Sequence, residues 1–132
     1  MIILDASAAI CVVRRASEGQ EVEKFIASSE CILAPDLFLS ETANVFWKYC
    51  QFDSLSPEIG RQMLDKAIGL VDVFLSSQDL AKEAFTLACS ANCSAYDALY
   101  LVAARRNSGT LITLDKKLQT IASKQDIDFV LI

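Results

Sequence analysis

Histidine is missing from the sequence altogether, and this omission excludes more chemistry than any other feature of the composition. Without it the chain cannot form a Ser-His-Asp triad, a Cys-His pair, a histidine general base or a histidine metal ligand. Any catalysis must therefore come from carboxylates, hydroxyls, amines or a bound metal ion.

Long apolar runs, repeats, low-complexity segments and linkers are also lacking. No apolar run approaches the length of a membrane span, and the first residues lack the basic start and cleavage site of a signal peptide. We therefore expect a cytoplasmic protein. Hydrophobic residues make up 53% of the 132 residues and charged residues 22%. A full core is available, so we expect one domain over residues 1–132.

The net charge and the cysteines further limit the possible functions and the redox environment of the protein. A net charge of −5 argues against a nucleic-acid-binding surface that works by bulk positive charge, but not against a nuclease whose local positive charge is a metal ion. The five cysteines are odd in number and lie in apolar segments, so we expect buried thiols in a reducing compartment. Cys89 and Cys93 share a helix face, yet the absence of a C-x-x-C pair and of histidine disfavours a zinc site.

Short apolar segments alternate with amphipathic ones along the chain, which predicts strands and helices in turn. The predicted strands are residues 2–4, 31–33, 71–75, 110–114 and 129–132, and the predicted helices are residues 7–13, 17–27, 36–52, 56–70, 78–90, 94–107 and 116–123. Strands separated by helices form crossover units, which build parallel sheets covered on both faces. The predicted fold class is α/β: a three-layer α/β/α sandwich around a mainly parallel sheet of about five short strands.

Residues 94–104 form the most unusual stretch of the chain, because as a helix they are apolar nearly all round. Such a pattern is typical of a helix buried on most faces. Asp97 is the only charged residue in the stretch, and a buried carboxylate must be neutralised, paired or bound to a metal ion. Ser94 and Asp97 also have the spacing of a capping box at a helix start, so both interpretations are open at this point.

Three further acids are candidate ligand-binding residues because of where they lie in the predicted strands and helices. Asp5 closes the first predicted strand and Asp115 follows the fourth, and ligands bind beyond the carboxyl ends of parallel strands. Glu41 lies in the largely apolar first half of the helix 36–52. Each has an ordinary explanation, since Asp5 and Asp115 would also serve as helix N-caps and Glu41 as part of a solvated face. If the acids converge, the pocket needs a cation, and oxygen ligands suit Mg²⁺ or Mn²⁺.

At these residues the chain resembles the PIN-domain ribonucleases, and its compact length resembles the toxin component of VapBC toxin–antitoxin pairs. The resemblance covers nearly the whole chain. It rests on Asp5 followed by Ser7, on Glu41 in an apolar helix, on the Tyr-Asp-Ala-Leu-Tyr block around Asp97, and on Leu-Ile-Thr-Leu before Asp115. It implies a metal-dependent endoribonuclease that hydrolyses RNA phosphodiesters with a metal-activated water.

The resemblance also implies roles for individual residues. Asp5, Glu41, Asp97 and Asp115 would hold one or two Mg²⁺ or Mn²⁺ ions, and the hydroxyls of Ser7 and Thr113 would orient those carboxylates. Asn44, one turn after Glu41, is a weaker candidate for the same pocket or for RNA.

Partners are predicted from basic pairs, from the resemblance and from surplus aromatic residues. Arg14, Arg15, Lys116 and Lys117 are candidates for RNA contact, or for ordinary solvated charge. The helix 36–52 carries more aromatic residues than one core can take, namely Phe46, Trp47, Tyr49 and Phe52. Exposed apolar patches usually mark interfaces, and the resemblance implies an antitoxin partner, so we expect a homodimer that also binds a cognate antitoxin.

Other classes of protein remain as alternatives. A PIN-fold interaction protein without catalytic activity is one, and metal-dependent turnover of RNA would separate it from an enzyme. A response-regulator receiver would need neighbouring acids after the first strand, and a haloacid-dehalogenase-like phosphatase would need Asp-x-Asp there. This chain has Asp5-Ala6-Ser7 after the first strand, so it lacks neighbouring acids there, and Ser7 stands where the second aspartate of Asp-x-Asp would be.

Overall fold

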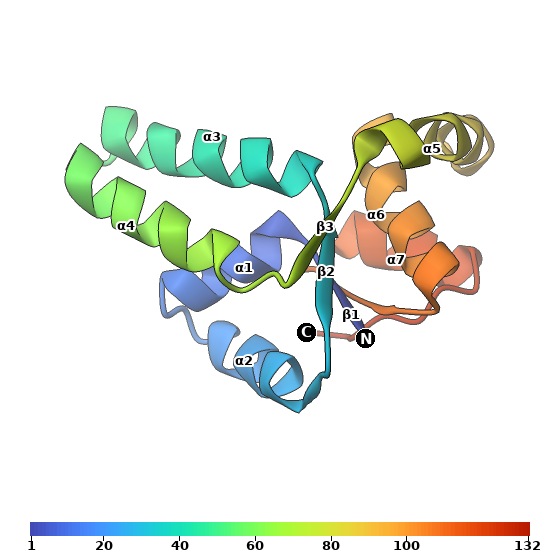
Figure 1. The fold of residues 1–132 in the computed structure, drawn as a ribbon, viewed down its shortest axis with the longest axis horizontal. Coiled ribbons are helices and arrows are strands. Elements are labelled where there is room, and N and C mark those ends of the chain that lie inside the picture. The colour runs from blue at the N-terminus through green and yellow to red at the C-terminus, as the bar shows by residue number, and fades with distance from the viewer.

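The structure is a computed structural model that describes residues 1–132, and a parallel four-stranded sheet lies at its centre (Figure 1). The strands are β1 (Ile2–Leu4), β2 (Ile32–Pro35), β3 (Val73–Leu75) and β4 (Thr110–Ile112), in the order β3-β2-β1-β4. All three pairings are parallel, with Ile3 opposite Leu33 on one side and Leu111 on the other. The predicted α/β class and parallel sheet are confirmed.

Helices cover both faces of the sheet, as Figure 1 shows. One face carries α1 (Ala6–Val13), α2 (Gly19–Ser28), α3 (Leu37–Phe52) and α4 (Pro57–Ile68); the other carries α5 (Ser77–Ala91), α6 (Ala95–Asn107) and α7 (Lys116–Lys124). None of these helices combines the length and the hydrophobicity needed to cross a lipid bilayer.

The strand β1 separates two hydrophobic cores. Ile3 packs into the core shared with α5, α6 and α7, whereas Ile2 and Leu4 pack into the core shared with α1 to α4. Successive side chains of a strand point to opposite faces of the sheet, so a strand covered on both faces must be apolar throughout. This is why the predicted strand 2–4 contains no polar residue.

The helix α6 is buried along most of its length. Every residue from Ala98 to Ala104 is buried, which agrees with the apolar pattern of the sequence. Its start is capped by the Ser94 hydroxyl, which accepts the Asp97 backbone N–H, and its end is marked by Ser108 in the left-handed region at φ 47°.

Two predictions about the fold are wrong in detail. Residues 129–132 do not form a fifth strand; they make a single parallel bridge, between Phe129 and Leu111. Beyond Ile112, where β4 ends, the backbone carbonyl of Thr113 accepts the Gln119 side-chain amide and the Leu114 N–H donates to the Ser7 hydroxyl, so neither group is free to pair with another strand. The cysteines are free, but Cys89 is exposed and only Cys11 is fully buried, so burial was overestimated.

The close approach of α1 and α2 depends on a glycine. A β-carbon at Gly19 would lie 2.7 Å from the carbonyl oxygen of Cys11. We therefore expect Gly19→Ala to lower the free energy of unfolding by about 1–3 kcal/mol in urea titrations, because backbone would have to move. Gly69→Ala is the control, since its β-carbon would come no closer than 3.3 Å to any atom. Equal losses in the two variants would contradict this explanation.

Candidate active site at the carboxyl edge of the sheet

Asp5 is the most buried acid of the chain and lies directly after β1. It is 7% exposed, and its Oδ2 accepts hydrogen bonds from the hydroxyls of Ser7 and Thr113, each at 2.6 Å. Because β1 and β4 are parallel neighbours, Thr113 arrives at the same edge of the sheet. Both hydroxyls use one oxygen, so Oδ1 receives no hydroxyl donor. Burial raises the pKa of Asp5, and the hydrogen bonds offset only part of that rise.

The two hydroxyls are themselves held in place. The Ser7 Oγ accepts the backbone N–H of Leu114 at 3.0 Å, and the Thr113 Oγ1 accepts that of Asp115 at 3.1 Å. Gln119, buried in α7, donates its side-chain amide to the carbonyl oxygen of Thr113 at 2.8 Å. The segment that leaves β4 is thereby tied to Asp5 from both sides.

Glu41 reaches the same region from α3, on one face of the sheet. Its Oε1 accepts a hydrogen bond of 2.6 Å from the phenol of Tyr100, which comes from α6 on the other face. Burial raises the pKa of Glu41, and the negative charges of Asp5 and Asp97 raise it further. The pKa of Tyr100 is raised by burial and by the negative charges of Asp5 and Glu41, so the phenol stays protonated and donates.

Asp97 is half-buried in the first turn of α6. Its backbone N–H donates to the Ser94 hydroxyl at 3.0 Å, but its carboxylate accepts no hydrogen bond from the Ser94 backbone N–H, so only half of a capping box forms. Burial is the main cause of its raised pKa, and the charges of Asp115 and Asp5 add to it. A hydrogen bond with the Ser94 side chain offsets part of this rise in pKa, so the carboxylate of Asp97 interacts both with the other acids and with the helix start.

Asp115 has two functions at once. It is exposed and caps α7, because its Oδ1 accepts the backbone N–H groups of Lys117 at 2.9 Å and Leu118 at 3.2 Å. The N-cap explanation is thus correct for this residue, whereas Asp5 makes no side-chain capping bond to α1. Asp115 still contributes negative charge beside Asp97, and its Oδ2 accepts no hydrogen bond.

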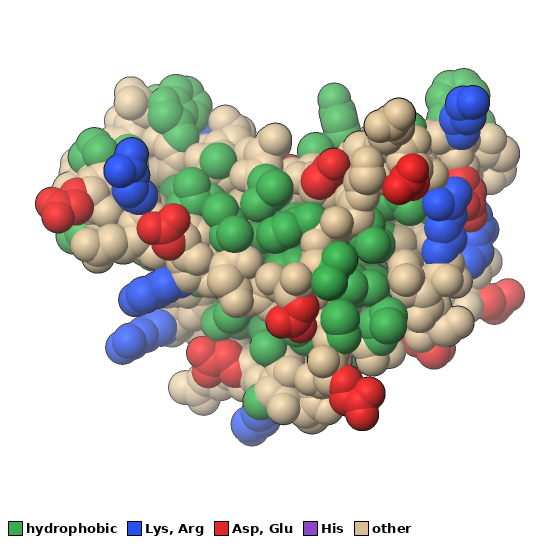
Figure 2. All heavy atoms as spheres, in the orientation of Figure 1, with side chains coloured by type: hydrophobic (Ala, Val, Ile, Leu, Met, Phe, Trp, Pro, Cys, Tyr) green, Lys and Arg blue, Asp and Glu red, His purple; other side chains and the backbone are tan.

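The four acids form one electrostatic group in which none of them forms a salt bridge, and Lys117 is the only basic residue whose charge acts on it. Repulsion links Asp5 to Glu41 and Asp97, and Asp97 to Asp115. The only salt bridges in the structure join Glu83 to Arg105 and Arg106, on α5 and α6. In Glu41 and Asp115 one carboxylate oxygen accepts hydrogen bonds and the other accepts none, and in Asp5 both hydroxyl donors bond to the same oxygen. The indentation between α3 and α5 in Figure 2 lies at this edge of the sheet.

This donor set suits a hard divalent cation, which prefers carboxylate and water oxygens. No three of the acidic or cysteine side chains come close enough together to enclose an ion. Like charges repel one another in the absence of a cation, so ion binding requires rotation of side chains toward a common centre.

Comparison with known proteins identifies the family. The model of the PIN domain family matches residues 2–124. The chain belongs to the PIN domain family. It is 27% identical over 119 residues to Ribonuclease VapC3 from Pyrobaculum aerophilum, covering 89% of this chain and 91% of that protein. The crystal structure of PAE2754 from Pyrobaculum aerophilum superposes with a TM-score of 0.74 at 22% identity, covering 91% and 84% of the two chains, and shows the same fold. The predicted resemblance is confirmed.

The four basic residues predicted to contact RNA differ in their hydrogen-bond partners and in their relation to the acids of this PIN domain. Arg14 lies at the far end of α1, where it donates to the Tyr49 phenol at 2.7 Å and stacks over its ring. Arg15 is exposed beside it. Lys116 donates to the carbonyl oxygen of Ile132. Lys117 alone is coupled to the acids, since its charge lowers the pKa of Asp97.

The sequence did not predict two residues of the candidate site, and it predicted a third without a definite role. Asn44 is exposed one turn after Glu41 and makes no side-chain hydrogen bond. Tyr100 and Gln119 were not predicted to touch the site. The signal for Tyr100 was its spacing of three residues from Asp97, which places both on one face of a helix. For Gln119 it was a polar residue inside the apolar stripe of α7.

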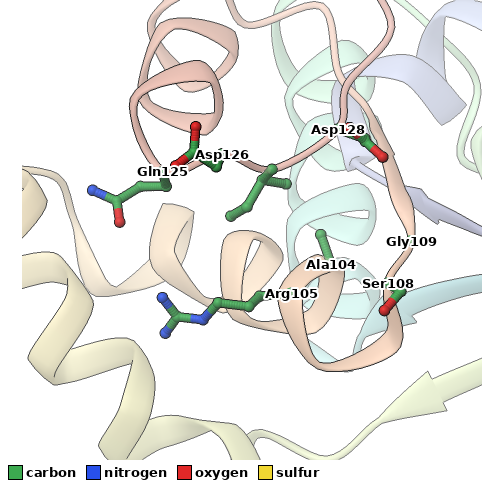
Figure 3. A pocket seen from close by; sticks show the side chains of 8 residues that line it. Ala104, Arg105, Ser108, Gly109, Gln125, Asp126 and Asp128 are labelled. Atoms are coloured by element: carbon green, nitrogen blue, oxygen red, sulfur yellow. The ribbon is translucent and has the colours of Figure 1, made fainter.

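Another hollow of this PIN domain, of about 250 Å³, lies elsewhere (Figure 3). Its lining includes Arg105, Gly109, Gln125 and Asp128, from the end of α6, the entry to β4 and the segment after α7. These elements meet at the amino end of β4, opposite the edge that carries Asp5. The hollow is therefore separate from the cluster of acids.

The clustered charges predict an unusual effect on stability. Asp97→Asn removes repulsion with Asp115 and Asp5 while leaving the backbone bond to Ser94 in place. In the presence of chelator we expect this variant to be more stable than the wild type, by on the order of 1 kcal/mol after solvent screening. Thermal melts followed by circular dichroism measure the change.

Ser94→Ala is the matched control at the same helix start. It removes the cap and should destabilise the PIN domain by about 1 kcal/mol. If Asp97→Asn instead melts lower than the wild type in chelator, the carboxylate stabilises the helix start and the repulsion described here does not dominate.

Proposed function

We propose that this PIN domain, residues 1–132, is a metal-dependent endoribonuclease acting in the cytoplasm as the toxin of a type II toxin–antitoxin pair. Membership of the PIN family and the similarity to Ribonuclease VapC3 support ribonuclease activity. The observation that carries the metal dependence is the set of mutually repelling carboxylates, of which Glu41 and Asp115 each leave one oxygen without a hydrogen bond.

Asp5, Glu41, Asp97 and Asp115 are the proposed ligands of Mg²⁺ or Mn²⁺. A bound divalent ion lowers the pKa of water and offsets negative charge on a phosphodiester in the transition state, which is the chemistry that histidine cannot provide here. Ser7 and Thr113 hold the buried oxygen of Asp5 and so leave its other oxygen for the ion. The reaction adds water across a phosphorus–oxygen bond of RNA.

The chain has a net charge of −5 and therefore does not attract RNA phosphates by its overall charge. RNA binding must depend on individual basic residues near the acids. Lys117 is the best-placed basic residue, since it lies beside Asp97 at the start of α7. Lys116, Arg14 and Arg15 remain weaker candidates, two of them already bonded within the protein. Asn44 on α3 would contact RNA from the side of Glu41.

The activity is tested with a panel of structured and unstructured RNAs in Mn²⁺ or in excess chelator. We expect internal cleavage in Mn²⁺ only, and a loss of at least about a hundredfold in rate for Asp5→Asn, because metal ions supply several kcal/mol to such reactions. Asp65→Asn, which neutralises an exposed acid on α4, should retain full activity.

Two results would contradict the proposal in different ways. Cleavage that continues undiminished in chelator would exclude the metal-dependent mechanism. A protein that binds a partner but cleaves no RNA under any of these conditions would be an interaction protein on a PIN fold.

The surface of α3 and α4 supports the proposed homodimer and antitoxin binding. Phe46 is 2% exposed, but Trp47 is 52% and Phe52 75% exposed, and these two rings stack edge-on at 6.2 Å. A hollow of about 250 Å³ lies beside Trp47 between the two helices. Hydrophobic side chains reach the surface over α3 and α4 in Figure 2, and such patches usually mark interfaces.

Sedimentation at tens of micromolar tests this surface. We expect the wild type to be dimeric and the variant Trp47→Glu to be monomeric, because a charge on the apolar patch opposes burial. Phe85→Glu alters an aromatic ring of similar exposure, 66%, on α5, and should remain dimeric. A wild type that stays monomeric, alone and with its antitoxin, would refute the interface.

A further inference from the structure

Tyr100 is a core residue with an unexpected hydrogen-bond partner. It is 1% exposed within the core formed by α5, α6 and α7, and a buried phenol must find an acceptor. The acceptor is the carboxylate of Glu41, at 2.6 Å, from a helix on the opposite face of the sheet. This length is typical of a strong hydrogen bond between a hydroxyl and a charged oxygen.

The bond lies where the two helix layers meet. Tyr100 follows Asp97 by three residues on α6, so both side chains project from the same helix face. Glu41 approaches from α3, and its bond to Tyr100 is the only hydrogen bond between α3 and α6. The phenol of Tyr100 is therefore the hydrogen-bonded link between the helices that carry two of the proposed metal ligands, Glu41 and Asp97.

Without that bond, little would hold Glu41 at the site. Its side chain has several rotatable bonds and is half-exposed, and no basic residue pairs with it. The negative charges of Asp5 and Asp97 repel it, and solvent offers it a better environment than a partly buried, negatively charged pocket. The phenol engages Oε1 and leaves Oε2 without a hydrogen bond.

We propose that Tyr100 is a positioning residue that holds Glu41 at the acidic site and so sets its affinity for a divalent cation. The inference rests on the metal site proposed above and goes beyond it by assigning a residue that does not itself bind the ion. The alternative is that Tyr100 only fills space in the core, in which case its ring matters and its oxygen does not.

Tyr100→Phe separates these roles, because phenylalanine keeps the ring and removes the oxygen. The probe is Mn²⁺ alone, titrated by calorimetry into wild-type protein and into each variant. We expect the dissociation constant to rise about 10- to 100-fold in Tyr100→Phe, as is usual when a partner of a metal ligand is removed. Tyr49→Phe is the matched control, because it loses the 2.7 Å hydrogen bond that the Tyr49 phenol accepts from Arg14, away from the acids, and it should bind Mn²⁺ as the wild type does.

A double-mutant comparison shows whether Tyr100 acts through Glu41. Glu41→Gln should weaken Mn²⁺ binding by itself, and adding Tyr100→Phe to it should cause no further loss, since the residue to be positioned no longer carries a charge. Additive losses would mean that the phenol acts on the site by another route and would refute the inference.

The outcomes for the site and for Tyr100 are distinguishable. A wild type that binds no Mn²⁺ refutes the proposed metal site and this inference with it. A wild type and Tyr100→Phe that bind Mn²⁺ equally refute this inference alone. A Tyr100→Phe protein that does not fold also overturns it, because the oxygen would then be a requirement of the core.

Discussion

The burial of the Asp5 carboxylate is the constraint on which the rest of the site depends. A charge that is 7% exposed and has no cationic partner is costly, and two hydroxyl donors recover only part of that cost. Thr113 follows β4 directly, donates its hydroxyl to Asp5 and is held by the Gln119 amide, which bonds to its carbonyl oxygen. The loop after β4 and the start of α7, and thus Asp115, take their positions from this one carboxylate.

The fold brings the other acids to Asp5 from separate layers. Glu41 belongs to α3 on one face of the sheet and Asp97 to α6 on the other, so they meet beyond the ends of the strands, where no strand separates the layers. Burial raises the pKa of Asp5, Glu41 and Asp97, and the neighbouring negative charges add to the rise for Glu41 and Asp97. Such an arrangement works against folding and is therefore best explained by ligand binding, which is consistent with membership of the PIN family.

The local patterns of the sequence were reliable guides to the elements and to the positions of the acids. Apolar strands, the Ser94 cap and the all-round burial of α6 follow from short-range periodicity, which depends only on backbone geometry. Asp5 and Asp115 were placed at the ends of strands by the same reasoning. The expectation of a fifth strand was wrong because pairing depends on whether the neighbouring strand offers free backbone groups, and β4 ends before residues 129–132 can continue along it.

The sequence by itself therefore determined which segments form the helices and four of the five predicted strands, and which acids stand at the edge of the sheet. Only the tertiary structure decided which side chains meet there. Tyr100 and Glu41 are 59 residues apart, and Thr113 and Asp5 are 108 apart. Contacts over such separations are set by how layers pack across the sheet. Periodicity reports the face of an element on which a residue lies, but not the partner that the opposite layer brings to it.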